Sequence, residues 1–227
     1  MQIGKFLRCA ELPLNSPLSA VTFSNRETSK IASMSIDLND PVAVLITAHQ
    51  ALRRAKIETA TYGGLALAVY GEPRETKDAD LAVAGAHTVA ARSALTAAGL
   101  NVLIAFDQVQ FGGQLVSRLT VFGGLGGSLN TVDLIKPRSD SYSRKVLLRA
   151  VTGELRGQQV RIVSPEDFVV LKVLASREQD LHDAASVARE LGNRLNLELI
   201  QNEIGSLASE ITDHDIRARW TRVQQMV

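Results

Sequence analysis

The sequence predicts an α+β fold: a small mixed sheet flanked by helices and followed by a helical C-terminal part. Three observations lead to this class. Helical and strand-like segments alternate from about residue 40 to residue 98, strand-like segments gather between residues 102 and 135, and helical periods fill the chain beyond residue 164. Such an order is typical of a sheet with helices packed on it.

The composition narrows the class of protein. The chain has 227 residues, is 45% hydrophobic and carries a formal net charge of +1, which suits a packed core and not a polybasic nucleic-acid coat. The single cysteine, Cys9, excludes an internal disulfide and a Cys-rich zinc module. No apolar run approaches the roughly 18 residues that cross a bilayer, and the N-terminus lacks the pattern of a secretory signal, so we expect a cytoplasmic protein.

Three regions of the chain differ in pattern. Residues 1–38 contain Pro13, Pro17 and many Ser and Asn without a sustained period, which predicts an N-terminal arm. The alternating pattern over residues 39–160 predicts the α/β core. The helical pattern over residues 161–227 predicts a helical C-terminal domain.

The core begins with a capped helix. Asp40 is a suitable N-cap and Pro41 a suitable first residue, and apolar residues follow at helical spacing to about Lys56. Next come a strand over 59–62, a Gly63-Gly64 turn, a short helix over 65–70 and a strand over 77–83. A small-residue helix over 86–98 ends at Gly99.

Three strands follow, over 102–106, 115–122 and 129–135. The segment "FGGLGGS" lies between the last two, lacks G-x-G-x-x-G spacing and precedes a strand, so it predicts a hairpin and not a dinucleotide site. Ser164 and Pro165 open the first C-terminal helix. Ser176 and Gln179 predict a capping box for a helix that ends at Gly192, and helices over about 196–208 and 213–226 complete the chain.

Two aspartates in "KDADLAV" carry the strongest chemical signal. Strand alternation places Asp78 and Asp80 on one side while Ala79, Leu81 and Val83 face the core. At about 4 to 5 Å and an effective dielectric near 20, two carboxylates repel by on the order of 3 to 4 kcal/mol. A cation relieves this repulsion, and Mg²⁺ prefers such hard oxygen ligands shared with substrate phosphates.

A third carboxylate comes from "NTVDLIK". Asp133 lies between Val132 and Leu134 and therefore points away from the core face of its strand. If that strand neighbours the first, the three carboxylates converge and suit a two-metal site, in which Asp133 is a ligand, a base or both.

Residues that suit phosphate binding lie close by. Gly63 and Gly64 precede a helix, so their N–H groups can approach an anion without a side chain in the way. Arg74 and Lys77 lie before the acidic strand, and Lys172 lies in the first C-terminal helix, from which it can reach the same pocket.

The order "GGLALAVYGEPRETKDADLAV … VDLIK … SPEDFVVLKVLASREQDLHD" resembles the nucleotidyltransferase fold of the polymerase β superfamily. It is most similar to the bacterial AbiEii-type minimal nucleotidyltransferases, toxins of type IV toxin-antitoxin pairs, over roughly residues 40 to 190. The resemblance implies Mg²⁺-dependent transfer of NMP from an NTP to an acceptor hydroxyl. It also implies Asp78, Asp80 and Asp133 as metal ligands, Gly63, Gly64 and Lys172 at the triphosphate, and a cognate antitoxin. The common Gly-Ser pair is Gly-Gly here.

Several alternatives stay open at this point. The acceptor is a tRNA, a protein side chain or a small molecule, and a non-catalytic nucleotide-binding or protein-interaction module with the same fold is the second hypothesis. Arg74 can instead pair with Glu72 or Glu75, and Lys172 can extend from the rim of its helix. Asp180 and Asp183 lie opposite the apolar face of their helix, where a solvated surface is as plausible as a catalytic role.

Overall fold

The computed structural model of the protein describes residues 36–123 and 127–227. The arm predicted at residues 1–38 therefore lies outside the described residues, except for residues 36–38. The strands are β1 (Ala60–Thr61), β2 (Ala79–Ala82), β3 (Asn101–Phe111), β4 (Gln114–Phe122), β5 (Leu129–Pro137), β6 (Val151–Leu155) and β7 (Gln158–Ile162). The helices are α1 (Pro41–Arg54), α2 (Gly63–Tyr70), α3 (Thr88–Ala97), α4 (Asp140–Arg149), α5 (Pro165–Leu174), α6 (Glu178–Leu191), α7 (Leu197–Glu210) and α8 (Ile216–Gln225), with a 3₁₀ turn η1 (Gly192–Arg194) after α6.

One mixed sheet of seven strands organises the molecule, in the order β3-β4-β5-β2-β1-β7-β6. The pairs β2–β5 and β1–β7 are parallel, and the pairs β3–β4, β4–β5, β1–β2 and β6–β7 are antiparallel. Four of the helices lie after the last strand of this sheet. The predicted α+β class, a mixed sheet followed by a helical C-terminal part, is confirmed.

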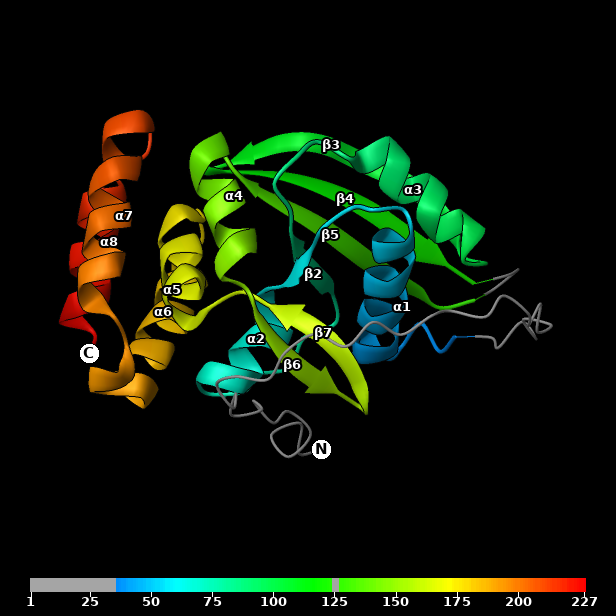
Figure 1. Cartoon of the computed structure of the whole chain (residues 1–227), viewed down its shortest axis with the longest axis horizontal. Coiled ribbons are helices and arrows are strands. Elements are labelled where there is room, and N and C mark those ends of the chain that lie inside the picture. The colour runs from blue at the N-terminus through cyan, green and yellow to red at the C-terminus, as the bar shows by residue number, and fades with distance from the viewer. Residues whose placement is uncertain (1–35, 124–126) are drawn as a thin grey trace, which may run out of the picture.

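The two faces of the sheet have different covers. Thr59, just before β1, contacts His49 of α1 through a hydrogen bond of 3.0 Å. Tyr62, just after β1, packs on Phe168 of α5 with ring centroids 5.7 Å apart. Because successive side chains alternate in an extended strand, α1 and α5 lie on opposite faces. In Figure 1, α3 lies beside α1, whereas α7 and α8 form the outermost layer beyond α5 and α6.

The predicted helix starts are largely confirmed. Asp40 caps α1 by accepting hydrogen bonds from the N–H groups of Val42 and Ala43, with Pro41 as the first residue of the helix. Ser164 caps α5 in the same way, through the N–H of Asp167. These caps satisfy N–H groups that lack an acceptor within the helix.

The glycine pair and the start of α6 differ from the sequence prediction. Gly63 and Gly64 form the first turn of α2 and not a separate turn before it. The capping box of α6 does not use Ser176 and Gln179. The N-cap is Arg177, whose backbone N–H donates to the Asp180 carboxylate at 3.3 Å. The same carboxylate also pairs with Lys172 and with the Arg177 side chain.

The region between β5 and α5 was not assigned from the sequence. It contains α4 and the hairpin of β6 and β7, and β7 extends the sheet through its pairing with β1. The predicted hairpin between β4 and β5 is present, with the N–H of Gly123 donating to the carbonyl of Ser128 at 3.1 Å, although residues 124–126 lie outside the described part. In the described residues, no helix is both long and apolar enough to span a membrane.

Candidate active site

Three charged side chains form a row across the centre of the sheet. Asp80 of β2 is the register partner of Asp133 in the parallel strand β5, and Asp133 is in turn the partner of Arg118 in β4. Register partners project to the same face, so the row lies on the face that carries Tyr62 and α5. The structure thus brings together Asp80 and Asp133, 53 positions apart in the chain.

Arg118, at the end of this row, binds the carboxylate of Asp133. Its Nε is 2.8 Å from Oδ1 of Asp133 and its Nη2 is 2.6 Å from Oδ2, which makes a bidentate ion pair. The same Nη2 lies 3.9 Å from Oδ2 of Asp78, so the guanidinium stands between two carboxylates. Asp78 keeps a fixed orientation because Oγ1 of Thr131 donates to its Oδ1 at 2.9 Å.

Asp80 carries the most perturbed carboxyl of the row. Burial, followed by the negative charges of Asp133 and Asp78, raises its pKa from 3.8 to about 6 against the opposing effect of Lys172. Asp78 is more open, with 46% of its side chain exposed, while Asp133 is 8% exposed. A carboxyl with a raised pKa beside two others indicates an excess of negative charge that a cation would stabilise.

The first glycine of α2 lies directly against this carboxyl. Gly63 has φ +63°, and a Cβ at this position would lie 1.8 Å from Oδ2 of Asp80. A residue with a side chain is therefore excluded twice, by strain and by collision. The N–H groups of the first turn of α2 therefore lie next to the Asp80 carboxyl. An anion that binds these N–H groups would lie close to a metal ion bound by this carboxyl.

The second glycine explains the departure from the common Gly-Ser pair. A Cβ on Gly64 would lie 2.6 Å from Cβ and 2.8 Å from Oγ1 of Thr76. The Thr76 side chain thus fills the space in which a serine would sit.

We expect Gly64→Ser to lower the free energy of unfolding by about 1–3 kcal/mol, as overpacking does. Urea denaturation measures this loss. Gly205→Ser is the matched control, because a Cβ there meets nothing closer than 4.0 Å, and serine is favoured over glycine in a helix. Equal stability of the Gly64→Ser variant and the wild type would contradict the packing argument.

The predicted triphosphate contact Lys172 lies in a buried network of ion pairs. Its Nζ is 2.9 Å from Asp180 and 2.8 Å from Asp183, and all three side chains are 1% exposed. The same Nζ lies 5.3 Å from the ring centre of Tyr62, the residue before Gly63. Although burial opposes its charge, the neighbouring Tyr62, Asp180 and Asp183 keep the pKa of Lys172 above its ordinary value.

Two arginines complete this network. Arg74 is bidentate to Asp183, with both N–O distances at 3.2 Å, and Arg177 binds Asp180 at 3.0 and 3.1 Å. Burial disfavours ionisation of both aspartates, yet Lys172 and the arginines hold the pKa of each carboxyl below its ordinary value. Asp180 and Asp183 are therefore buried ion-pair partners, and the solvated-surface interpretation is wrong for both.

The other predicted phosphate contacts differ from each other in environment. Arg74 pairs with Asp183 and not with the side chain of Glu72 or Glu75, while 35% of its side chain stays exposed. Lys77 is exposed and has no hydrogen bond or ion pair within the part of the chain that the structure describes. Lys77 is thus the predicted cation with the fewest bonds to give up when a phosphate arrives.

The carboxylates of Asp78, Asp80 and Asp133 are together called the acidic row. Whether a divalent cation fits the acidic row depends on Arg118. The donors are carboxylate oxygens of the kind that Mg²⁺ prefers, and the raised pKa of Asp80 marks the need for positive charge there. In residues 36–123 and 127–227, no three His, Cys, Asp or Glu side chains are arranged to hold a metal ion together. Asp133 is bound to Arg118 instead, so Asp78 and Asp80 fit a cation as they stand, and Asp133 fits it once Arg118 moves aside.

Sequence reasoning missed Arg118, although a signal for it exists. The hairpin prediction places Phe122 opposite Leu129, and counting back along both strands puts Arg118 opposite Asp133. Strand register, and not residue type, is the evidence that identifies this partner.

A glycine pair that opens a helix, next to one aspartate on a strand, a second just before that strand and a third on the paired strand, defines a nucleotidyltransferase-like α+β protein. The chain belongs to the family of nucleotidyl transferases of unknown function (DUF2204), whose model matches residues 43–224. This membership supports nucleotidyl transfer as its general activity.

The solved structures that are similar to this chain include the following two. An antigenic nucleotidyltransferase-like protein from Paracoccidioides brasiliensis is 20% identical with a TM-score of 0.46, over 78% of this chain and 91% of that one. JHP933 from Helicobacter pylori is 18% identical with a TM-score of 0.45, over 79% of this chain and 85% of that one. A search of curated proteins gives no match.

Proposed function

We propose that the protein transfers NMP from an NTP to an acceptor hydroxyl in a Mg²⁺-dependent reaction. The observation that carries this proposal is the contact between Gly63 and Asp80, in line with Asp133. It puts the N–H groups of a helix N-terminus beside carboxylates that need a cation.

Each residue then has a distinct task. The N–H groups of Gly63 and Gly64 hold the phosphates of the NTP, and Lys77 contacts them from the segment before β2. Asp78 and Asp80 hold Mg²⁺, which when bound supplies charge stabilisation for the phosphates. Arg74 and Lys172 act mainly through Asp180 and Asp183, because a direct contact with phosphate would cost them part of their ion pairs.

The acceptor hydroxyl attacks the α-phosphorus while the bond to the pyrophosphate oxygen breaks. Asp133 accepts the proton of the hydroxyl after its release from Arg118. Pyrophosphate leaves with the electron pair of the broken bond.

The enzymatic proposal is tested with each labelled NTP, Mg²⁺ and total tRNA or a cell extract as the source of acceptor. We expect label in one acceptor fraction with the wild type and none with Asp80→Asn. Absence of transfer with every NTP and acceptor, or equal transfer by the variant, would refute the proposal.

Arg118 supports a second candidate, a non-catalytic nucleotide-binding module that regulates a partner protein. Its bidentate pair with Asp133 neutralises the acid that would accept the proton. Calorimetric titration separates the two candidates, since both predict NTP binding and only the first predicts turnover.

The active-enzyme proposal makes a prediction for Arg118→Gln. Because the guanidinium competes with a cation for Asp133 and Asp78, its removal should lower the Mg²⁺ concentration for half-maximal transfer by about tenfold, about 1.4 kcal/mol. A Mg²⁺ titration of initial rates measures this, with Arg138→Gln as the control, since Arg138 pairs with Asp213 elsewhere. A higher Mg²⁺ requirement in Arg118→Gln would show that Arg118 serves the NTP instead.

We also propose that the protein is an AbiEii-type toxin whose acceptor is a tRNA or a protein and whose partner is a cognate antitoxin. The support is the order of motifs in "GGLALAVYGEPRETKDADLAV". Induced expression should arrest growth, Asp80→Asn should not, and co-expression of the neighbouring reading frame should restore growth. Normal growth with the wild type, at a level of protein that transfers label in vitro, would remove the toxin role alone.

A further inference from the structure

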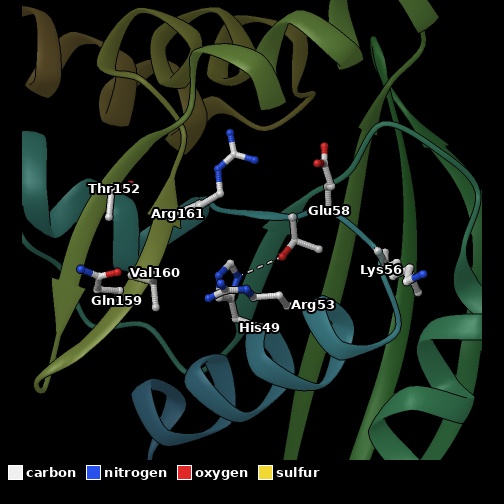
Figure 2. Close-up of a pocket in the computed structure, with 10 residues that line it drawn as sticks. His49, Arg53, Lys56, Glu58, Thr152, Gln159, Val160 and Arg161 are labelled. Carbon is white, nitrogen blue, oxygen red and sulfur yellow. Dashed lines mark hydrogen bonds between the residues drawn. The ribbon is translucent and has the colours of Figure 1, made fainter. Parts of the chain in front are cut away.

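A cavity lies at the opposite end of β1 from Gly63. It has a volume of about 430 Å³ and is bordered by the end of α1, the segment before β1 and the hairpin of β6 and β7 (Figure 2). Its lining includes His49, Arg53, Lys56, Thr59, Val160 and Arg161. None of these belongs to the acidic row or to the network around Lys172.

The cavity exists because two neighbouring strands separate. In the described part of the chain, β1 and β7 share a single register pair, Thr61 and Ile162. Before that pair, β7 continues in its hairpin with β6, while the segment before β1 turns towards α1. Figure 2 shows Glu58 on one side of the opening and Gln159 and Val160 on the other.

Positive charge is concentrated at this opening. Arg53, Lys56 and Arg161 line it together with one acid, Glu58. Among the described residues, none of the three cations has a carboxylate partner, and Arg161 donates instead to the backbone carbonyl of Leu147. This differs from the catalytic face, where Arg74, Arg118 and Arg177 are all paired with aspartates.

A buried histidine adds a polar group to the floor of the cavity. His49 is 5% exposed, and its Nδ1 lies 3.0 Å from Oγ1 of Thr59. Its other ring nitrogen, Nε2, has no hydrogen-bond partner among the described residues. Burial, followed by the charges of Arg53 and Arg161, lowers the pKa of the imidazole, which is therefore neutral at neutral pH. When the Thr59 hydroxyl donates to Nδ1, Nε2–H is a free donor.

We propose that this cavity is a second ligand site, which binds a phosphate monoester of about mononucleotide size. Arg53, Lys56 and Arg161 contact the phosphate oxygens, and His49 donates from below. Ile57 and Val160 line the apolar part of the wall, against which the rest of the ligand packs. The volume lies within the range of small-molecule sites, about 300 to 1,000 Å³, and charge-assisted bonds from arginine favour phosphate.

Calorimetric titration in EDTA tests the site, because without metal the acidic row repels phosphates. The probes are AMP, UMP, ribose 5-phosphate, inorganic phosphate and uncharged adenosine. We expect at least one ester to bind with one site per chain, more tightly than inorganic phosphate, and adenosine not to bind. Failure of every ester to bind, or equal affinity for inorganic phosphate, overturns the proposal.

Matched variants localise the ligand. Arg53→Gln and Arg161→Gln should each weaken ester binding by about tenfold or more, and Glu58→Gln should strengthen it. Arg54→Gln makes the same charge change one residue further along α1, outside the cavity lining, and should leave the affinity unchanged. Equal weakening by Arg54→Gln would show a general charge effect and overturn the site.

A readout at His49 makes the test independent of catalysis. The ester should shift the imidazole resonances of His49 in the wild type and in Asp80→Asn alike. Because Arg53 is exposed, Arg53→Gln should fold normally even if Arg161→Gln does not. If the ester binds without moving the His49 resonances, the ligand is elsewhere and the proposal fails.

Discussion

Asp80→Asn should abolish nucleotidyl transfer and at the same time stabilise the metal-free protein. The loss of activity follows from the role proposed for Asp80, which is to hold Mg²⁺ beside the phosphates. Several kcal/mol of transition-state stabilisation at 1.36 kcal/mol per decade corresponds to a rate loss on the order of a thousandfold or more. Initial rates with the preferred NTP measure it.

The gain in stability follows from the pKa of Asp80. Its folded-state value of about 6 lies above the ordinary 3.8, so ionisation is less favourable in the folded protein than in the unfolded chain. Below about pH 4 the carboxyl is protonated in both the folded and the unfolded state, so it does not reduce the free energy of unfolding. Between about pH 4 and 6 the folded state loses stability as the pH rises, and above that range the loss is constant, at most about 3 kcal/mol.

Asparagine at position 80 removes this loss. In EDTA, urea denaturation should show wild type and variant nearly equal at pH 4, with the variant more stable by up to about 3 kcal/mol at pH 7.5. Asp78→Asn is the matched control. Its side chain is 46% exposed and bonded to Thr131, so this variant should lose activity without the gain in stability. A pH-independent difference between wild type and Asp80→Asn would contradict the charge argument.

The central part of this site was accessible from sequence because strand alternation is a rigid rule. Asp80 in "KDADLAV" and Asp133 in "NTVDLIK" are each flanked by apolar residues, which fixes the face on which they lie, whereas Asp78 lies just before β2, because the strand predicted over 77–83 spans only Ala79–Ala82. The parallel register of β2 and β5 then aligns Asp80 with Asp133. That register is set by the packing of the whole sheet. The sequence alone does not show that these two strands are neighbours, so their pairing has to be assumed.

Other features depended on contacts that no local pattern reveals. The helical period of α6 correctly predicts that Leu181 and Ala184 are buried, yet it places Asp183 opposite the apolar face, where a solvated surface is as plausible as a catalytic role. That face is covered by α5 and by the segment that carries Arg74, so the aspartate is buried by elements distant in sequence. Likewise, β7 pairs with β1 at a single register pair. So short a pairing leaves no pattern in the sequence that would predict it.

The network around Lys172 supplies the second large prediction, because its charges are unequal. Three cations, Lys172, Arg74 and Arg177, share two carboxylates. The arginines are partly exposed and can turn to solvent, whereas Lys172 is 1% exposed and cannot. The stability of this part of the protein therefore depends on whether Lys172 retains at least one carboxylate.

We expect Asp180→Asn and Asp183→Asn alone to have modest effects, because each leaves Lys172 one aspartate. The double variant leaves a buried ammonium without a carboxylate and should lose about 3–5 kcal/mol, more than the sum of the single losses. Lys172→Met in the same background removes the unpaired charge, so the triple variant should recover much of this loss. Urea denaturation at pH 7.5 measures all four proteins.

This design separates a structural role of Lys172 from a direct role at the triphosphate. Lys172→Met alone should be tolerated, because Asp180 keeps Arg177 and Asp183 keeps Arg74. If the ammonium acts through Tyr62 and Gly63, this variant should weaken NTP binding only slightly, since the glycine N–H groups remain in place. A large loss of NTP affinity in a stably folded Lys172→Met variant would instead place the ammonium on the phosphates. Additive losses in the double variant would show that the three side chains do not form one electrostatic unit.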